Sequence, residues 1–355
     1  MVKLIMSFPN LLFSKSQINK AGETLIQPHP KFEEILHAFE VISNWRACHG
    51  YPMNTFQVTL RRRLKSFDSA IGAERLKRIP SIIDKLRLQQ NMQLSRMQDI
   101  GGLRAVVKNM DDVNRLKKIY LSDKRVGHKL TRQDNYITKP KLDGYRSIHL
   151  IYKYFNNKNH DYDGLLIELQ IRTKFQHIWA TAVETMGTYL GQKLKSGQGD
   201  AKWREFFLIS SAAFTYLEKT PKIPQYNKLN KEETYHELIK VEKELNALHI
   251  MRNYGLALKV VENKIGKANY YHLIILNSLK GTVAVKSYPK NAIQRASKDY
   301  LAIEKRIQNG EQIETVLVSA GDFRELKKAY PNYFFDMQGF IKNIEKIIQP
   351  RVSKN

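Results

Sequence analysis

Between residues 103 and 190, short runs rich in β-branched residues alternate with segments of helical periodicity. This alternation constrains the fold more than any other feature of the sequence. A β-branched run with few polar residues predicts a strand, whereas apolar residues three and four positions apart predict a helix. The predicted strands are Leu103–Val107, Ser147–Phe155 and Leu165–Ile171, and the predicted helices are Met110–Leu121 and Lys174–Leu190. Strands and helices mixed in this order predict an α+β fold built on a mixed β-sheet flanked by helices.

The rest of the chain predicts helices before this sheet and a separate module after it. Two helices are expected on either side of His49–Pro52, and another over Ser81–Gln93. After a proline-containing turn, a long charged helix is predicted over Glu232–Val261. The last predicted elements, in the order strand, strand, helix, strand, helix, are Tyr271–Leu276, Thr282–Ser287, Ala292–Ile307, Glu314–Ser319 and Gln338–Ile348. We therefore expect a first domain over residues 1–225, a linking helix over 226–265 and a small ββαβα module over 266–355.

The composition restricts the partners and the compartment of the protein. The chain has 59 Lys and Arg against 34 Asp and Glu, a formal net charge of +25, which predicts a polyanionic partner. Its single cysteine, Cys48, excludes an intramolecular disulfide and a cysteine-built zinc site, and is typical of a reducing compartment. We find neither a signal-peptide pattern nor a run of about 20 apolar residues, so we expect a cytoplasmic protein without membrane contact.

A first group of polar residues surrounds the start of the helix predicted over Ser81–Gln93. Arg75 and Lys77 precede this helix, and Ser81 and Lys85 lie in its first turns. Cations and a hydroxyl group at a helix N-terminus, where free backbone N–H groups already favour anions, indicate a phosphate-binding segment. The alternative is the basic start of a solvent-exposed helix.

Two carboxylates adjoin the predicted strands. Asp99 lies just before the first of them, and Glu168, Gln170 and Arg172 share one face of a later strand because side chains alternate with a period of two. Hard carboxylate oxygens are the ligands that Mg²⁺ prefers, and nucleotide phosphates can complete its octahedron. Asp99 and Glu168 are therefore candidate metal ligands, although an alternating strand can also simply be half exposed.

A polar loop over residues 134–149 carries lysines around a proline and then Gly144 and Tyr145, immediately before a predicted strand. A tyrosine in this position can offer its ring to a nucleic-acid base, and such stacking contributes about 1–3 kcal/mol per base. A hairpin tyrosine that packs on its neighbours is the alternative.

In chain order, the segments RLKRIPSIIDK, DIGGLR, PKLDGYRSIH and ELQIRT resemble the RelA/SpoT nucleotide pyrophosphokinase domain, the catalytic fold of (p)ppGpp synthetases. The resemblance covers about Arg75 to Glu184. It implies a nucleotidyltransferase-like synthetase domain that moves the β,γ-pyrophosphate of ATP to a ribose 3′-hydroxyl with the help of Mg²⁺.

The resemblance also implies roles for individual residues. Asp99 is expected to be the principal Mg²⁺ ligand, and Glu168 either to bind the metal or to activate the hydroxyl. Arg75 and Lys77 match the motif that contacts ATP, and Tyr145 matches the tyrosine that stacks on the base of the acceptor. The further residues expected around the phosphates, the acceptor and the carboxylates are Ser81, Lys85, Lys141, Arg146, His149, Gln170 and Arg172.

Two departures from the family pattern narrow the prediction. Ile79–Pro80 stands directly before Ser81, where ordinary synthetases have a basic or histidine-containing approach that grips the phosphates of a guanine nucleotide. The one His–Asp dipeptide, His160–Asp161, lies in a polar turn without partner histidines, so no hydrolase half is expected. We therefore expect a synthetase without a hydrolase activity.

Near the C-terminus, Tyr330 and Tyr333 form a Y-x-x-Y pair that resembles the neutralising motif of CapRel-type fused toxin–antitoxin proteins. These belong to the toxic small alarmone synthetases and defend against phage. The stretches SKSQINKAG and NWRACHGYPMNTF and a C-terminal pseudo-zinc-finger module without zinc ligands are also similar. The resemblance implies that the tyrosines occupy the ATP site until a phage protein, typically the major capsid protein, releases them. Two tyrosines packed under a β-turn are the alternative.

The same resemblance implies that the acceptor is the 3′-CCA end of tRNA, whose modification stops translation. A tRNA acceptor arm requires a broad basic surface, which the net charge and the run Arg61, Arg62, Arg63 and Lys65 can supply. GDP or GTP, used by an ordinary small alarmone synthetase, is the alternative acceptor. A catalytically idle RNA-binding module is the alternative from a different functional class.

Overall fold

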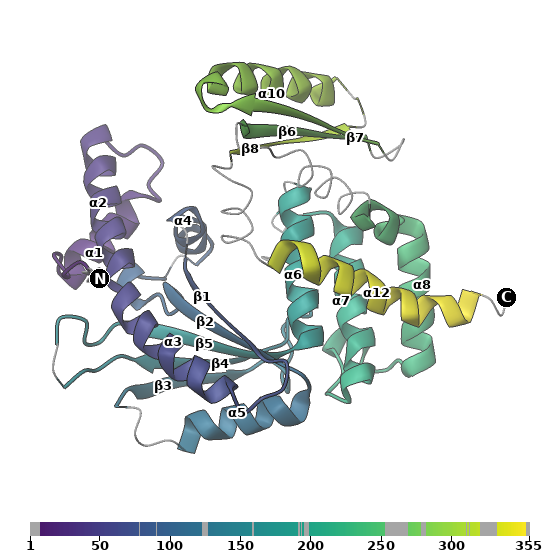
Figure 1. Ribbon diagram of the computed structural model, residues 1–355, viewed down its shortest axis with the longest axis horizontal. Helices are drawn as coiled ribbons and strands as arrows, with labels where there is room; N and C mark the ends of the chain where they lie inside the picture. The colour runs from purple at the N-terminus through teal and green to yellow at the C-terminus, as the bar shows by residue number, and fades with distance from the viewer. Residues whose placement is uncertain are drawn as a thin grey trace, which may run out of the picture. The chain divides into compact units, whose positions relative to one another are not determined.

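The computed structural model describes residues 8–77, 79–89, 91–122, 127–157, 160–190, 192, 194, 199–252, 269–277, 282–309, 311, 313–319 and 332–352. The chain divides into two compact units (Figure 1). The first contains Met1–Lys139 and Arg146–Lys174, and the second contains Pro140–Tyr145 and Phe175–Asn355. No helix in these described ranges is both long enough and apolar enough to span a membrane.

The first unit is built on a five-stranded mixed sheet, which confirms the predicted α+β class. The strands, in spatial order, are β1 (Ile71–Leu76), β2 (Gly101–Val107), β5 (Leu166–Thr173), β4 (Ile148–Lys153) and β3 (Lys129–Asn135). Strands β2 and β5 are parallel, and all other neighbours are antiparallel. The two edge strands were not predicted from the sequence, whereas the three central strands were.

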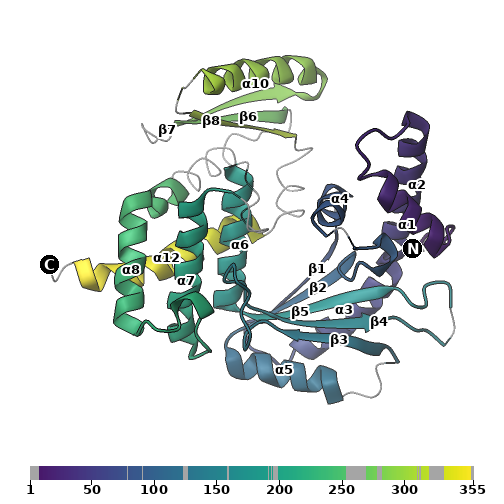
Figure 2. The ribbon, with the colours of Figure 1, turned by 180° about the vertical axis from the view of Figure 1, so that it is seen from behind.

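Helices of the first unit surround this sheet (Figures 1 and 2). They are α1 (Lys15–Thr24), α2 (Phe32–Cys48), α3 (Gly50–Leu64), α4 (Ile79–Leu88) and α5 (Met110–Ser122). The predicted pair of helices around His49–Pro52 is confirmed, because α2 ends at Cys48 and α3 begins at Gly50. The helix predicted over Ser81–Gln93 begins earlier and ends at Leu88.

Helices α3 and α5 cover one face of the sheet. A Cβ atom on Gly72 of β1 would approach Leu64 and Leu60 of α3. On the same face, the Tyr152 hydroxyl of β4 donates a 3.2 Å hydrogen bond to the carbonyl of Tyr120 in α5. Part of the apolar core of the first unit therefore lies between these helices and the sheet, and the same core extends to buried residues of α1, α2 and α4.

The opposite face of the sheet carries the polar side chains, and we call it the polar face. Register fixes its members, because directly paired residues point to the same side. Glu168 pairs with Gly102 and Ile151, and Gln170 pairs with Arg104 and His149. The polar side chains on this face include Arg75 of β1, Arg104 of β2, His149 of β4, and Glu168, Gln170 and Arg172 of β5.

The second unit contains a layer of helices: α6 (Lys174–Tyr189), α7 (Ala201–Glu218), α8 (Lys231–Leu245) and α12 (Asn332–Val352). Helix α12 packs on α7 through the fully buried Phe340, whose ring centroid lies 5.7–6.1 Å from those of Phe206, Phe207 and Phe214. The sequence predicts this last helix as part of the C-terminal module over 266–355, whereas in the structure it packs on α7, within the range 1–225. Phe340 needs an apolar partner, and the three phenylalanines of α7 provide it.

Helix α8 is shorter than the predicted helix over Glu232–Val261. It ends at Leu245 because Asn246 adopts a left-handed conformation with φ 53° and donates its N–H to the Glu242 carbonyl, which is a common way to end a helix. Residues 247–252 are helical again after this turn, and residues 253–261, the remainder of the predicted helix, lie outside the described residues.

The remaining elements of the second unit form a small ββαβ arrangement. They are β6 (Asn269–Asn277), β7 (Thr282–Pro289), α10 (Ile293–Gln308) and β8 (Ile313–Ser319). The strands make an antiparallel sheet in the order β7-β6-β8. Its small core includes Leu273, Tyr288, Ala296, Ile303 and Ile313. These strands and α10 lie where the sequence predicted them, whereas the likeness of this module to a zinc finger stays a prediction.

Candidate active site

The most concentrated charge cluster of the first unit surrounds Asp99. The Asp99 carboxylate accepts a 2.8 Å hydrogen bond on each oxygen, from Lys77 Nζ on Oδ2 and from Lys85 Nζ on Oδ1. Three separate segments supply these groups, because Lys77 follows β1, Lys85 lies on α4 and Asp99 precedes β2. The sequence predicted all three as site residues, and the structure brings them together.

Backbone contacts hold the Lys77 end of this cluster in place. The Lys77 N–H donates a 2.8 Å hydrogen bond to the carbonyl of Ile100, which extends the β1–β2 pairing by one residue. The Lys77 carbonyl accepts a 2.7 Å hydrogen bond from Arg46 Nε of α2. The backbone of Lys77 is therefore held by two neighbouring elements.

A second cluster surrounds Glu168 on the polar face. Its Oε1 lies 2.8 Å from Nδ1 of His149 on the neighbouring strand β4. Its Oε2 accepts a 2.6 Å hydrogen bond from Nε2 of Gln170, and Arg172 donates in turn to Oε1 of Gln170. Arg172 thereby orients the Gln170 amide so that its NH₂ group points toward Glu168. Glu168, Gln170 and Arg172 thus share one face of β5 as the sequence predicts, and the structure adds the contact of Glu168 with His149.

Both carboxylates are ionised at neutral pH. Burial works to raise the pKa of Asp99, but the charges and hydrogen bonds of Lys77 and Lys85 hold it well below its usual range. Burial also works to raise the pKa of Glu168, but His149 and Gln170 lower it overall. The negative charge of Asp99 acts in the direction that raises the pKa of Glu168, but the contacts with His149 and Gln170 outweigh it.

These two carboxylates fit a magnesium ion in chemistry, since both offer hard, ionised oxygens. Asp99 and Glu168 would hold the ion together with phosphate oxygens of a nucleotide and water. In the part of the chain that the structure describes, no group of three or more His, Cys, Asp or Glu side chains is arranged to hold a metal. Protein side chains alone therefore provide an incomplete coordination sphere.

The polar loop places the other predicted binding residues at different depths. In the second unit, Tyr145 is 9% exposed and the Lys141 ammonium lies 5.3 Å from its ring centroid. Gly144, at φ 86°, packs closely against Ser211, whose hydroxyl donates a 2.6 Å hydrogen bond to its carbonyl. The stacking role of Tyr145 stays a prediction, and the structure adds a packing role for the loop.

Three further predicted residues differ in their access to a ligand. Arg75 and Ser81 are exposed, and Arg75 lies on the polar face opposite Gly102. Arg146, in contrast, is only 2% exposed. Its predicted contact with phosphate requires the surrounding side chains to open, whereas the other two are accessible as the chain stands.

Of the basic run at the end of α3, Arg63 is not available for the broad basic surface that the sequence predicted. Arg63 is buried at 9% exposure, with its guanidinium 3.9 Å from the ring centroid of Tyr120, because it lies on the core side of α3 one turn after Leu60. Arg61, Arg62 and Lys65 are exposed. They belong to a helix that covers the face of the sheet opposite to the polar face.

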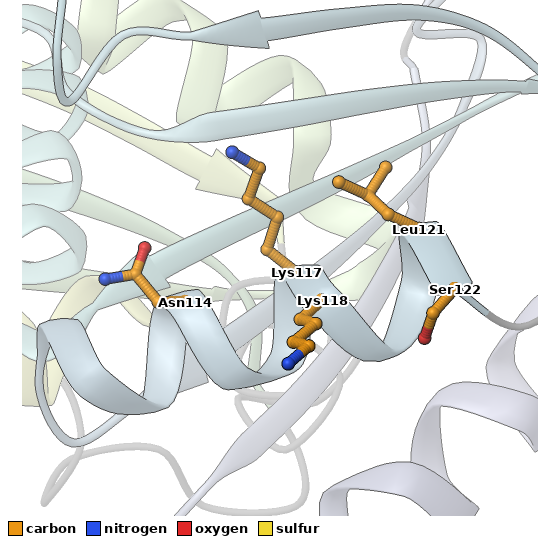
Figure 3. Close-up of a pocket in the computed structure, with 5 residues that line it drawn as sticks. All are labelled: Asn114, Lys117, Lys118, Leu121 and Ser122. Carbon is orange, nitrogen blue, oxygen red and sulfur yellow. The ribbon is translucent and has the colours of Figure 1, made fainter.

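A surface depression of about 400 Å³ is also found on the α5 side of the sheet (Figure 3). Its lining residues all come from α5 and are Asn114, Lys117, Lys118, Leu121 and Ser122. They include no carboxylate or histidine, and α5 covers the face opposite to Glu168. This depression is therefore separate from the candidate active site.

Two residues of the polar surroundings were missed. Arg104 lies on the polar face in register with Gln170, and the ring of Tyr136 meets that of His149 edge-on at 5.1 Å. The period of two from Gly102 could have identified Arg104. Tyr136 directly follows β3, which was not predicted from the sequence. Its contact with His149 depends on the pairing of β3 with β4.

The two tyrosines of the autoinhibition prediction are largely not covered by the described residues. Tyr330 lies outside the described residues, and Tyr333 lies in the first turn of α12, where its side chain is not described. Their predicted occupation of an ATP site therefore stays a prediction.

Comparison with known proteins identifies the class of the sheet region. Residues 74–193 match the family model described as a region found in RelA / SpoT proteins. The matched range contains Asp99, Lys85, His149 and Glu168. Over this range the chain is therefore similar to the region found in RelA / SpoT proteins.

Two curated relatives come from Bacillus subtilis (strain 168). The GTP pyrophosphokinase YjbM is 34% identical over 109 residues, which are 30% of this chain and 51% of that protein. The GTP pyrophosphokinase YwaC is 27% identical over 144 residues, 40% of this chain and 63% of that protein. The chain therefore spans between about half and two thirds of these relatives.

Solved structures of similar proteins include small alarmone synthetase 1 from Bacillus subtilis bound to its product pppGpp, with a TM-score of 0.44 and 24% identity. That match covers 50% of this chain and 92% of the other. A GTP pyrophosphokinase family protein from Streptococcus pneumoniae matches with a TM-score of 0.42 and 21% identity, over 56% and 96% of the two chains. With scores below 0.5, these likenesses add nothing to the family match.

Proposed function

We propose that this chain is an ATP-dependent pyrophosphotransferase. The observation that carries the proposal is the Asp99 carboxylate held 2.8 Å from both Lys77 Nζ and Lys85 Nζ, together with the Glu168 carboxylate held by His149 and Gln170. Cations beside carboxylates suit a reaction that places negative charge on phosphate oxygens. The RelA/SpoT match of residues 74–193 and the names of both Bacillus relatives support the same reaction class.

In the proposed reaction, the oxygen of an acceptor 3′-hydroxyl attacks the β-phosphorus of ATP. The bond between that phosphorus and the α,β-bridging oxygen breaks, so AMP leaves and the acceptor keeps the pyrophosphate. Lys77, Lys85 and Arg75 offset the charge that develops on the phosphate oxygens. A Mg²⁺ ion held by Asp99 and Glu168 would supply further charge neutralisation.

Glu168 is the proposed acceptor of the hydroxyl proton when it does not serve as a metal ligand. His149 and Gln170 each contact one of its oxygens, so the carboxylate is held in one orientation. Its lowered pKa keeps it ionised and therefore able to accept a proton near neutral pH. Tyr145 is proposed to stack on the base of the acceptor.

We propose the 3′-CCA end of tRNA as the acceptor. The support is the net charge of +25, because a tRNA needs a broad basic surface whereas a mononucleotide needs only a few local cations. Arg61, Arg62 and Lys65 lie on the far side of the sheet, so they would contact only a part of the RNA remote from its 3′ end. The second candidate is synthesis of (p)ppGpp from GDP or GTP, which is favoured by the names of both Bacillus relatives.

We further propose that the protein is an anti-phage fused toxin–antitoxin. In this proposal the segment after residue 266 inhibits the synthetase through Tyr330 and Tyr333, and a phage protein such as the major capsid protein relieves the inhibition. The support is the Y-x-x-Y pair and the presence of a ββαβ module beyond the RelA/SpoT region.

The test is transfer of label from [γ-³²P]ATP by the full chain, with bulk tRNA, GDP or GTP as acceptor and with or without phage capsid protein. Labelled tRNA that requires the capsid protein supports the whole proposal. If guanosine polyphosphate is labelled and tRNA is not, the acceptor is a guanine nucleotide and the proposed enzyme class still holds. Binding of tRNA without transfer to any acceptor, in the wild type and in a Tyr333→Ala variant, leaves the RNA-binding module as the function. Glu168→Gln is the matched inactive control.

A further inference from the structure

Both carboxylate oxygens of Asp99 are already bonded to cations of the protein. Lys77 Nζ and Lys85 Nζ each lie 2.8 Å from a different oxygen, and the three side chains are only 11%, 27% and 18% exposed for Lys77, Lys85 and Asp99. Exposed ion pairs contribute little, but charge-assisted hydrogen bonds with limited access to water are among the stronger ones. Each Asp99 oxygen therefore already has a cationic partner within the protein, and the two ammonium charges oppose the approach of a metal cation.

The rest of the cluster offers a metal ion little compensation. Among the residues that the structure describes, Asp99 and Glu168 have no third His, Cys, Asp or Glu placed with them to hold a metal. Both oxygens of Glu168 are also engaged, by His149 and Gln170. A divalent cation of the Mg²⁺ type needs about six oxygen ligands, so most of them must come from phosphate and water.

A polyphosphate changes this balance because it provides other anionic partners for the lysines. Lys77 and Lys85 are the cations that the proposed function assigns to the phosphates of ATP. Phosphate oxygens compete with Asp99 for the N–H donors of these ammonium groups and offset their positive charge. The same phosphates bring the additional oxygen ligands that the protein lacks.

We propose that Lys77 and Lys85 act as counter-ions that keep divalent cations away from Asp99 until a polyphosphate binds, so that metal and nucleotide bind together. The inference rests on the proposed function for the identity of the nucleotide. Its consequence is unusual, since removal of a positive charge that binds ATP increases the affinity of the free protein for metal.

The experiment measures Mn²⁺ binding to the full chain without nucleotide, by loss of the electron paramagnetic resonance signal of the free ion. Lys85→Met removes one counter-ion, Lys85→Arg keeps the charge, and Lys118→Met on α5 is a control with the same change of net charge. We expect Lys85→Met to bind Mn²⁺ at least about tenfold more tightly than the wild type, the fold-change that corresponds to one charge-assisted hydrogen bond. Lys85→Arg and Lys118→Met are expected to behave like the wild type.

The double variant Lys85→Met/Asp99→Asn assigns the gained site, and it should lose the gain completely. Circular dichroism melting of each variant shows that the chain is folded. Should Lys85→Met disturb the fold, Lys77→Met replaces it with the same expectation. Equal Mn²⁺ affinity in the wild type and in a folded lysine variant overturns the proposal. A gain that persists without the Asp99 charge overturns it as well.

Nucleotide binding is measured separately, so that failure of the proposed function is recognised as such. Isothermal titration of wild type with α,β-methylene-ATP, with and without Mn²⁺, should show binding that strengthens with the metal. Absence of any nucleotide binding contradicts the proposed function, while the nucleotide-free arms still decide whether Lys85 excludes metal from Asp99.

Discussion

Substitution of Phe340 by alanine tests whether α12 is an integral part of the helical layer of the second unit. Phe340 is fully buried, and its ring meets those of Phe206, Phe207 and Phe214 with centroids 6.1, 5.8 and 5.7 Å away. Neighbouring α12 residues such as Ile344 are also buried. Loss of this ring leaves a cavity between α7 and α12.

The magnitude follows from the burial. Replacement of a buried phenylalanine by alanine reduces the free energy of unfolding by about 3–5 kcal/mol, because the transfer free energy is lost and the cavity collapses only in part. A surface substitution of the same kind changes stability by only about 0.5 kcal/mol. Phe32 on α2, which is 73% exposed, therefore provides a matched Phe→Ala control.

Urea denaturation followed by tryptophan fluorescence measures the effect. Trp203 reports on this region, since its ring stacks on that of Phe207 at 5.9 Å. The packing of α12 on α7 is refuted if Phe340→Ala destabilises the protein no more than Phe32→Ala. A large loss has a practical consequence, because deletion of residues 332–355 would then damage the helical layer. Autoinhibition should be tested by substitution of Tyr330 or Tyr333 instead of truncation.

Three further outcomes are expected. Glu168→Gln should lower kcat, measured by single-turnover transfer, by about 100- to 10,000-fold. Calorimetry should show a nearly unchanged melting temperature. A kcat within tenfold of wild type would exclude Glu168 as the proton acceptor. A double-mutant cycle of Lys85→Met and Asp99→Asn in urea should give a coupling of about 1.5–3 kcal/mol at pH 7, and a coupling near zero would contradict the ion pair. Because the pKa of Asp99 is lowered on folding, this coupling is fully present above about pH 4, the range of an unfolded aspartate, and is lost as the pH falls toward the folded value. Tyr333→Ala should release activity without a trigger, so unchanged growth of cells that express it, with the catalytic residues intact, would remove the autoinhibition proposal.

The sequence predicts the central strands of the sheet well because they are buried. β2, β4 and β5 are rich in β-branched and other apolar residues, and this composition reflects their buried positions. The edge strand β3, with the sequence KLTRQDN, is mostly exposed and has almost no apolar periodicity. Only its pairing with β4 makes it a strand, and that information is not local.

The site shows the same division between local and tertiary information. The alternation of β5 predicted that Glu168, Gln170 and Arg172 share a face, and the structure agrees. The pairing of Asp99 with two lysines could not be predicted, since it depends on how α4 and β1 approach the start of β2.

Two errors have different causes. The basic run at the end of α3 was interpreted by charge alone, although helical spacing from Leu60 places Arg63 toward the core. The position of α12 was assigned by chain order, but partner choice among apolar helices is a tertiary property. Phe340 packs with the rings of α7.

The central claim is that the two terminal phosphates of ATP move together under the control of Asp99 and Glu168. Parallel reactions with [β-³²P]ATP and [γ-³²P]ATP, in wild type and in Asp99→Asn and Glu168→Gln variants, measure this directly. Equal incorporation of both labels into the acceptor, with an equal amount of AMP released and loss of both signals in the variants, is the predicted result. Incorporation of the γ label alone, with ADP as the product, would contradict it.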